Sequence, residues 1–180
     1  GIEELYVSPF LRTLSTAEPI SKALGIPAKV WTDIYEVGGV HVDGVGVGGM
    51  TKSEMQEVFP GYIIQDGDVD DENGWYDTKR NKETKAMGKE RIENVMKTLR
   101  QWSRENQQDR TIALVVHGDL IDFLLQAAHQ MEGTNKHFVC LNTSITVMDI
   151  SSDGQAMVLF HNFVSHLPPS LVRFDKLGKI

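Results

Sequence analysis

The sequence predicts an α/β fold built on a mostly parallel sheet with helices on both faces. Short apolar runs, such as residues 5–7 and 112–116, alternate with longer segments whose apolar residues recur at helical spacing. That alternation is typical of parallel sheets covered by helices. Two later runs, residues 144–150 and 156–160, are joined by an Asp-Gly turn and predict an antiparallel hairpin. We therefore expect a three-layer α/β/α sandwich with an antiparallel edge strand.

Size and composition indicate one ordinary globular domain, residues 1–180. A chain of 180 residues would be cramped as two domains, and its 41% hydrophobic and 24% charged residues are common globular values. The net charge of -7 argues against a protein that binds nucleic acid through a basic face. No run reaches the length of a membrane span, no signal-like segment is present, and the single cysteine, Cys140, suits a reducing compartment. We expect a cytoplasmic protein without a membrane or nucleic-acid partner.

The first part of the chain predicts a strand, a helix and a second strand, followed by an excursion at residues 37–80 that we expect to lie over the functional site. The elements expected before it are a strand at residues 5–7, a helix at 13–24 that stops at Gly25, and a strand at 29–31. Six glycines between residues 37 and 50 disfavour regular structure, and the Lys-Ser/Thr ending of a P-loop is missing. We interpret them as a mobile surface segment.

The excursion continues with a short helix and an acidic stretch. Thr51 and Glu54 form a capping box, so a helix should run to residue 58 or 59. Residues 66–72 resemble the opening of a calcium loop but lack its turn glycine, and its closing glutamate is also missing. A solvated acidic loop is expected there, and no metal or cofactor is implied anywhere in the chain.

The second part of the chain predicts a long amphipathic helix over residues 81–106. Its solvent face carries Glu83 and Glu90, and its other face is apolar. After the strand that ends at residue 116, a further helix is expected at 119–131, with Asp119 as its N-cap.

Two polar side chains follow strands of the expected parallel sheet. Arg12 comes shortly after the first apolar run, and His117 directly follows the run that ends at Val116. Because ligands bind at the carboxyl edge of such sheets, we expect the two side chains to converge there. The guanidinium presents a fork of donors suited to phosphate, and the imidazole can donate to the same oxyanion or move a proton. The pattern predicts a phosphate site.

Several motifs together resemble the histidine phosphatase superfamily, which includes the cofactor-dependent phosphoglycerate mutases. Residues 8–17 (SPFLRTLSTA) resemble its SPxxRTxxTA segment, and residues 116–118 (VHG) resemble its second histidine motif. Residues 34–39 (IYEVGG) resemble the segment with its proton-donating glutamate, while residues 142–145 and 166–167 resemble C-terminal landmarks. The order and spacing agree over nearly the whole chain. The resemblance implies a phosphoglycerate mutase-like fold and phosphoryl transfer through a phosphohistidine.

The resemblance also implies a role for individual residues. Arg12 would clamp the phosphoryl group, and His117 would bind one of its oxygens and help to position the nucleophile. Gly118 would let the backbone approach the ligand, while Ser8 would bond the phosphate or brace the loop. Glu36 would protonate the leaving oxygen and then take a proton from water, which it does best if partial burial raises its pKa.

One motif of the family is missing. The family's nucleophile lies in an Arg-His-Gly motif ahead of the SPxxRT segment, and none of the six histidines here follows an arginine. The strand near Gly1 also has nothing upstream to supply its neighbours. We expect that several dozen N-terminal residues with the first strand of the domain are missing, and alternatively that the chain is a natural pseudoenzyme. The chain taken alone should then be inactive and poorly stable, and a partner chain or a second copy could fill the slot.

The first functional hypothesis is a phosphatase that hydrolyses a small phosphomonoester. The acidic and glycine-rich character of the excursion favours hydrolysis over a mutase reaction, which normally needs a cationic pocket to retain its intermediate. The alternatives are a non-catalytic phosphate-binding or scaffold protein and a phosphoglycerate mutase. A nucleotide-binding oxidoreductase is disfavoured because no dinucleotide fingerprint is present.

Overall fold

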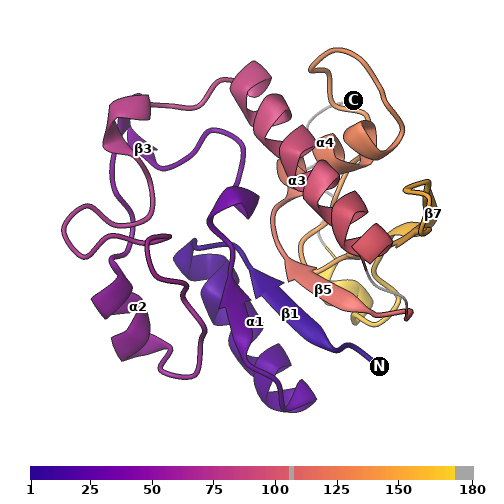
Figure 1. Ribbon diagram of the computed structural model, residues 1–180, viewed down its shortest axis with the longest axis horizontal. Helices are drawn as coiled ribbons and strands as arrows, with labels where there is room; N and C mark the ends of the chain where they lie inside the picture. The colour runs from indigo at the N-terminus through magenta and orange to yellow at the C-terminus, as the bar shows by residue number, and fades with distance from the viewer. Residues whose placement is uncertain (106–107, 173–180) are drawn as a thin grey trace.

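A three-stranded parallel sheet lies at the centre of the molecule, in the order β2-β1-β5 (Figure 1). The computed structural model describes residues 1–105 and 108–172; the expected helix end at residue 106 and the tail 173–180 lie outside them. The sheet and its covering helices comprise β1 (Glu4–Val7), β2 (Ala28–Val30), β5 (Ile112–Val115), α1 (Leu11–Leu24), α3 (Lys85–Glu105) and α4 (Gly118–Ala128).

Alternate residues of the sheet pack against opposite layers. Leu5 and Val7 are fully buried in the cluster that includes residues of α1, while Tyr6 and Leu114 pack against the cluster formed by α3 and α4. The helices therefore cover both faces, and the predicted α/β class with parallel and antiparallel strands is confirmed. Among the described helices, none combines the length and the apolar character that crossing a bilayer requires.

The glycine-rich segment folds back onto the rest of the excursion. It contains a minimal hairpin, β3 (His41–Val42) and β4 (Val45–Gly46), and leads to α2 (Lys52–Val58). A Cβ at Gly48 would lie 1.6 Å from the carbonyl oxygen of Asn73, and a Cβ at Gly49 would lie 2.3 Å from the Trp75 indole nitrogen. These glycines permit close backbone packing, a role that the local sequence does not indicate. The predicted capping box at the start of α2 is confirmed.

The long helix begins later than predicted. Residues 81–84 were expected to be helical, but the first helical residue is Lys85. The backbone N–H of Lys82 donates to Gly44, and that of Glu83 donates to Gly38. Asn81 has a φ of 53°, outside the helical region, and Thr84 caps the helix: its hydroxyl accepts from Met87 N–H at 3.3 Å and its carbonyl from Gly88 N–H at 2.9 Å.

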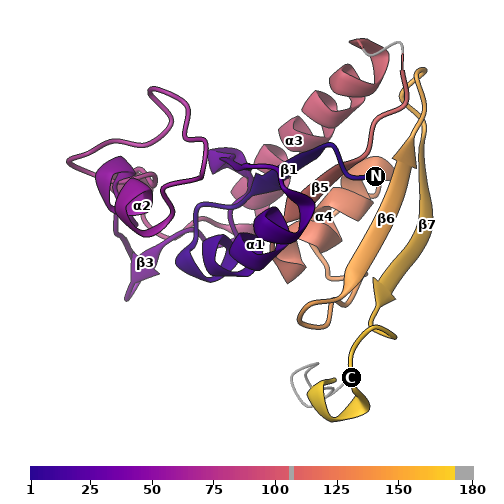
Figure 2. The ribbon, with the colours of Figure 1, turned by 90° about the horizontal axis from the view of Figure 1, so that it is seen from below.

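The predicted hairpin forms, but as a sheet of its own. β6 (Ile145–Ile150) and β7 (Ala156–Phe163) pair antiparallel and stand beside α4 (Figure 2). Within the described part of the chain, β5 pairs only with β1. The carbonyl of Val115 faces β1, where it accepts from Ser8 N–H at 3.1 Å. Backbone groups alternate along a strand, so those of Ile112 and Leu114 point to the other edge, which no described strand occupies.

Candidate phosphate site

Three side chains meet just beyond the carboxyl ends of β1 and β5. His117 Nε2 lies 2.7 Å from Ser8 Oγ, and its Nδ1 lies 3.0 Å from an Arg12 guanidinium nitrogen. Ser8 directly follows β1, Arg12 is in the first turn of α1, and His117 lies between β5 and α4. The parallel pairing of β1 and β5 thus brings together residues 105 and 109 positions apart in the chain.

The hydrogen bonds assign the tautomer of His117. Because a guanidinium can only donate, Nδ1 accepts from Arg12 and the ring proton lies on Nε2, which donates to Ser8 Oγ. Burial lowers the pKa of His117 to about 3, with further lowering by the charges of Arg12 and Arg91. The imidazole is therefore neutral at pH 7, and the Ser8 hydroxyl keeps its own proton for another acceptor.

Arg12 is a cation at the positive end of a helix. Its guanidinium lies 4.1 Å from the centroid of the Phe10 ring, and no acidic residue occurs in the first turn of α1. Among the described residues, no carboxylate forms an ion pair with it. A cation and a helix N-terminus repel each other unless an anion lies between them, so the arrangement suits a phosphate.

Glu36 approaches the same helix start from the loop after a 3-10 turn, η1 (Thr32–Ile34). Its Oε1 accepts from the backbone N–H of Val37 at 2.9 Å and of Leu120 at 3.1 Å. Burial raises the pKa of Glu36, and the charge of Asp119 raises it further, although hydrogen bonds from the backbone of Val37, Asp119 and Leu120 oppose the shift. A carboxyl group with a raised pKa near His117 is suited to donating a proton.

Gly118 and Asp119 differ in part from their expected roles. Gly118 is the first residue of α4, and a Cβ there would make an ordinary 3.7 Å contact with Cys140 Cβ. The prediction that Asp119 is the N-cap is wrong: the helix begins one residue earlier, so His117 occupies that position. Asp119 instead pairs with Lys136 at 2.7 Å. Cys140 lies close by, and burial raises the pKa of its thiol to about 11, which leaves it unreactive.

Two features near the site were not predicted from the sequence. Glu83 was expected on a solvated helix face, which is wrong: it is 5% exposed and ion-paired with Arg91, because α3 begins after it. The Phe10 ring lies 5.1 Å from both the Trp75 and the His117 rings, so the excursion packs directly against the site. Neither contact has a local sequence signal, since each depends on segments distant in the chain.

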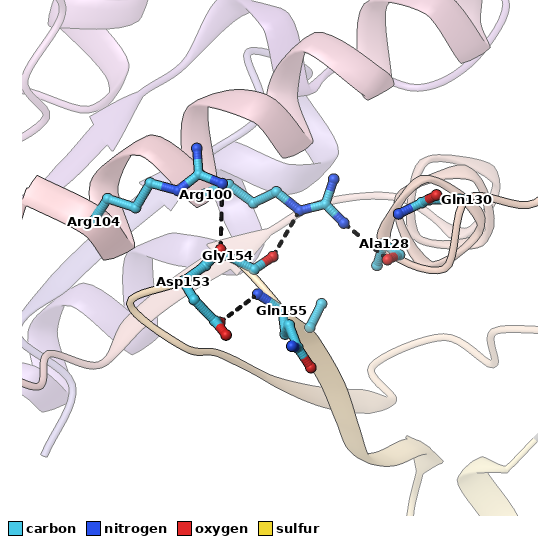
Figure 3. A pocket seen from close by; sticks show the side chains of 8 residues that line it. Arg100, Arg104, Ala128, Gln130, Asp153, Gly154 and Gln155 are labelled. Atoms are coloured by element: carbon cyan, nitrogen blue, oxygen red, sulfur yellow. Dashed lines mark hydrogen bonds between the residues drawn. The ribbon is translucent and has the colours of Figure 1, made fainter.

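A hollow of about 570 Å³ lies away from these residues, between the last turns of α3 and α4 and the turn between β6 and β7 (Figure 3). Arg100 donates to the carbonyls of Gly154 at 3.0 Å and Ala128 at 2.9 Å, and Arg104 approaches that of Asp153 at 3.4 Å. The hollow includes none of the predicted site residues. Its arginines tie the hairpin to the two helices.

Fold and site together define an α/β protein in which Ser8, Arg12 and His117 meet at the carboxyl edge of the parallel strands. The chain belongs to the histidine phosphatase superfamily (branch 1), whose family model matches residues 1–162. The resemblance noted in the sequence is thereby confirmed.

Solved structures share the fold at low sequence identity. YhfR of Bacillus stearothermophilus is 18% identical with a TM-score of 0.57, over 92% of this chain and 76% of that chain. A mycobacterial glucosyl-3-phosphoglycerate phosphatase with inorganic phosphate is 17% identical with a TM-score of 0.54, over 93% and 80%. The same phosphatase with VO3 is 16% identical with a TM-score of 0.55, over 91% and 78%. A search of curated proteins found no match.

Proposed function

We propose that this chain is the phosphate-binding part of a phosphatase that hydrolyses a small phosphomonoester through a phosphohistidine intermediate. The observation that carries the proposal is the contact of Arg12 and Ser8 with the two ring nitrogens of His117. Arg12 keeps further guanidinium N–H groups and Ser8 keeps its hydroxyl proton, so both can donate to an anion at the carboxyl edge of the sheet. Fixed donors of this kind stabilise the charge that spreads over the phosphoryl oxygens in the transition state.

Each residue then has a defined task. Arg12 and Ser8 hold the phosphoryl oxygens, and His117 joins them when its Nε2–H turns from Ser8 Oγ to a phosphoryl oxygen. A nucleophilic histidine nitrogen then attacks phosphorus and the ester P–O bond breaks. Glu36 gives its proton to the departing oxygen. Water then attacks the phosphohistidine, the N–P bond breaks, and Glu36 takes the proton of the water. The raised pKa of Glu36 supports this cycle.

We place the nucleophile on a segment outside these 180 residues, because none of the six histidines follows an arginine. The free edge of β5 supports an added strand: the backbone groups of Ile112 and Leu114 point to it, and main-chain pairing gives such additions their affinity. A parallel strand there would end beside His117, which follows β5. The segment could be N-terminal to Gly1, or belong to a partner chain or a second copy.

Hydrolysis is preferred over a mutase reaction. The carboxylates of the acidic stretch are engaged by nearby groups of the excursion, with Asp66 paired to Lys52 and Asp71 bonded to Ser53. Residues 37–80 contain nine acidic and three basic side chains, so the excursion offers no net positive charge to retain a phosphorylated intermediate for return transfer.

The direct test is expression of the chain together with the sequence encoded upstream of Gly1, followed by an assay with 4-nitrophenyl phosphate. Turnover with an acid-labile phosphohistidine, lost when the upstream histidine or Arg12 is replaced, would support the proposal. The matched control is Arg104→Ala, an arginine in the remote hollow. A folded, extended protein with neither turnover nor phosphohistidine would refute it.

A second candidate is a phosphate-binding protein without catalysis. The absence of Arg-His-Gly favours it. If the upstream coding sequence contains no such motif and phosphate still binds in an Arg12-dependent way, this candidate replaces the first.

A further inference from the structure

A buried carboxylate just before α3 collects four hydrogen bonds. Glu83 Oε1 accepts from the Tyr35 hydroxyl at 2.7 Å and from Arg91 Nε at 2.9 Å. Its Oε2 accepts from an Arg91 terminal nitrogen at 2.8 Å and from the Gly38 backbone N–H at 3.3 Å. Buried charges persist in proteins when they are paired and fully hydrogen-bonded, as this one is.

Arg91 reaches the same loop by a second route. Its remaining guanidinium nitrogen donates to the Asp33 carbonyl at 2.7 Å, and its guanidinium carbon lies 3.5 Å from the centroid of the Tyr35 ring. Together with the hydrogen bond from the Gly38 backbone N–H to Glu83, these contacts hold the backbone on both sides of Glu36. The ion pair makes no hydrogen bond to Glu36 itself.

The side chain of Glu36 depends on that backbone for its position. The hydrogen bonds to its carboxylate come from neutral backbone donors, those of Val37, Leu120 and Asp119. The titratable groups that face it are Asp119, from α4, and Cys140, from the loop before β6. Neither attracts a carboxylate, so Glu36 is kept at the start of α4 by these backbone hydrogen bonds and by the loop that carries it.

Gly88 allows α3 to approach the loop. It is buried, and a Cβ at this position would lie 3.0 Å from both Glu83 Oε2 and a methyl carbon of Val37. The packing of Glu83 and Val37 against α3 therefore needs a residue without a side chain at position 88, because a single methyl group would fill the space.

We propose that Glu83 and Arg91 are positioning residues for Glu36, with Gly88 providing the space that their ion pair needs. The proposal rests on the role of Glu36 given under the proposed function. The ion pair fixes the loop, the loop keeps the Glu36 carboxyl buried at the start of α4, and the carboxyl is thereby held beside His117.

The test uses three variants that disturb this arrangement differently. Glu83→Gln removes the charge, Arg91→Lys keeps a charge but loses the planar fork, and Gly88→Ala keeps every charge and pushes on the loop. Glu90→Gln, an exposed position on the same helix, is the matched control.

The first measurement is the titration of the Glu36 carboxyl carbon by 13C NMR in the full chain, assigned with Glu36→Gln. We expect the midpoint to fall toward the ordinary range of a glutamate in all three variants, because a displaced loop admits water to the carboxyl. It should stay unchanged in Glu90→Gln. This measurement needs no turnover, so it separates the positioning role from the proposed function.

The second measurement is kinetics on the catalytically complete protein described above. Because misplacement of about 1 Å costs up to 10²-fold, we expect kcat to fall on the order of 10-fold with KM unchanged. Variants that melt cooperatively but keep the wild-type Glu36 midpoint would overturn the proposal and leave the ion pair a structural role. If the charge variants do not fold, Gly88→Ala decides by the same criterion.

Discussion

The guanidinium of Arg12 donates to Nδ1 of His117 across 3.0 Å, although 105 positions separate the two residues. This bond makes the imidazole a neutral donor through its other nitrogen, and it leaves the remaining N–H groups of Arg12 unpaired with any carboxylate among the described residues. The site is thus assembled before any anion arrives.

Replacement of Arg12 should weaken phosphate binding. Charged hydrogen bonds contribute about 1.5–3 kcal/mol each, so Arg12→Ala should raise the Kd for phosphate by about 10- to 100-fold. Calorimetric titration with inorganic phosphate would measure this. The Kd of Arg12→Lys should lie between those of the wild type and Arg12→Ala, because lysine keeps the charge but lacks the planar fork of donors. Equal affinity in Arg12→Ala and the wild type would contradict the assignment.

Phosphate should raise the pKa of His117. In the free protein that pKa is lowered to about 3, and a dianion beside the ring favours the protonated form. The ring C–H signals of His117, followed by 1H NMR against pH, should therefore titrate at higher pH when phosphate is present. An unchanged midpoint at saturating phosphate would place the anion elsewhere.

The same histidine should make the protein less stable in acid. Its folded pKa is about 3 against an ordinary 6.5, so the unfolded chain binds the proton preferentially between these values. The contribution of neutral His117 to the free energy of unfolding is fully present above pH 6.5 and decreases as the pH falls toward 3. The loss amounts to about 2 kcal/mol at pH 5. Urea unfolding at pH 7 and pH 5 would measure the loss, which His117→Gln should reduce. An equal loss in that variant would assign it to other groups.

Gly48→Ala should destabilise the excursion. The added methyl would overlap the Asn73 carbonyl, which is backbone and cannot move aside, so we expect a cost of about 1–3 kcal/mol in the free energy of unfolding. Gly61→Ala is the control, because nothing lies within 4 Å of its Cβ position. Chemical denaturation of both variants tests this, and similar stabilities would argue against close packing of the segment.

Amide exchange should reveal the open edge of β5. The N–H groups of Ile112 and Leu114 point to that edge and should exchange faster than those of Ala113 and Val115, which face β1. Hydrogen exchange followed by NMR would resolve the four sites. Addition of the segment that carries the nucleophile should slow the exchange of the Ile112 and Leu114 amides. Equal protection of all four amides in the absence of that segment would indicate that the edge is already covered.

Local patterns predicted much of the fold. The capping box at Thr51, the stop of α1 at Gly25 and the hairpin around Gly154 each arise from a few neighbouring residues, and all are present. The convergence of Arg12 and His117 followed from the topology of parallel sheets.

The remainder depends on contacts between distant segments. The start of α3 moves because Thr84 caps it, while Lys82 and Glu83 bond to Gly44 and Gly38 in the excursion, and the burial of Glu83 follows from that shift. No window of sequence around residue 83 contains that information. The close packing of Gly48 on Asn73 is hidden for the same reason.

The distribution of the three tryptophans gives the protein an internal optical probe. Trp31 and Trp102 lie 5.1 Å apart beside Tyr6, whereas Trp75 touches Phe10, the ring that lies against His117. With the first two replaced by phenylalanine, the emission would come from Trp75 and would respond to changes around its neighbours Phe10, Tyr35 and Tyr76. Ligand titrations by fluorescence are therefore within reach without any attached dye.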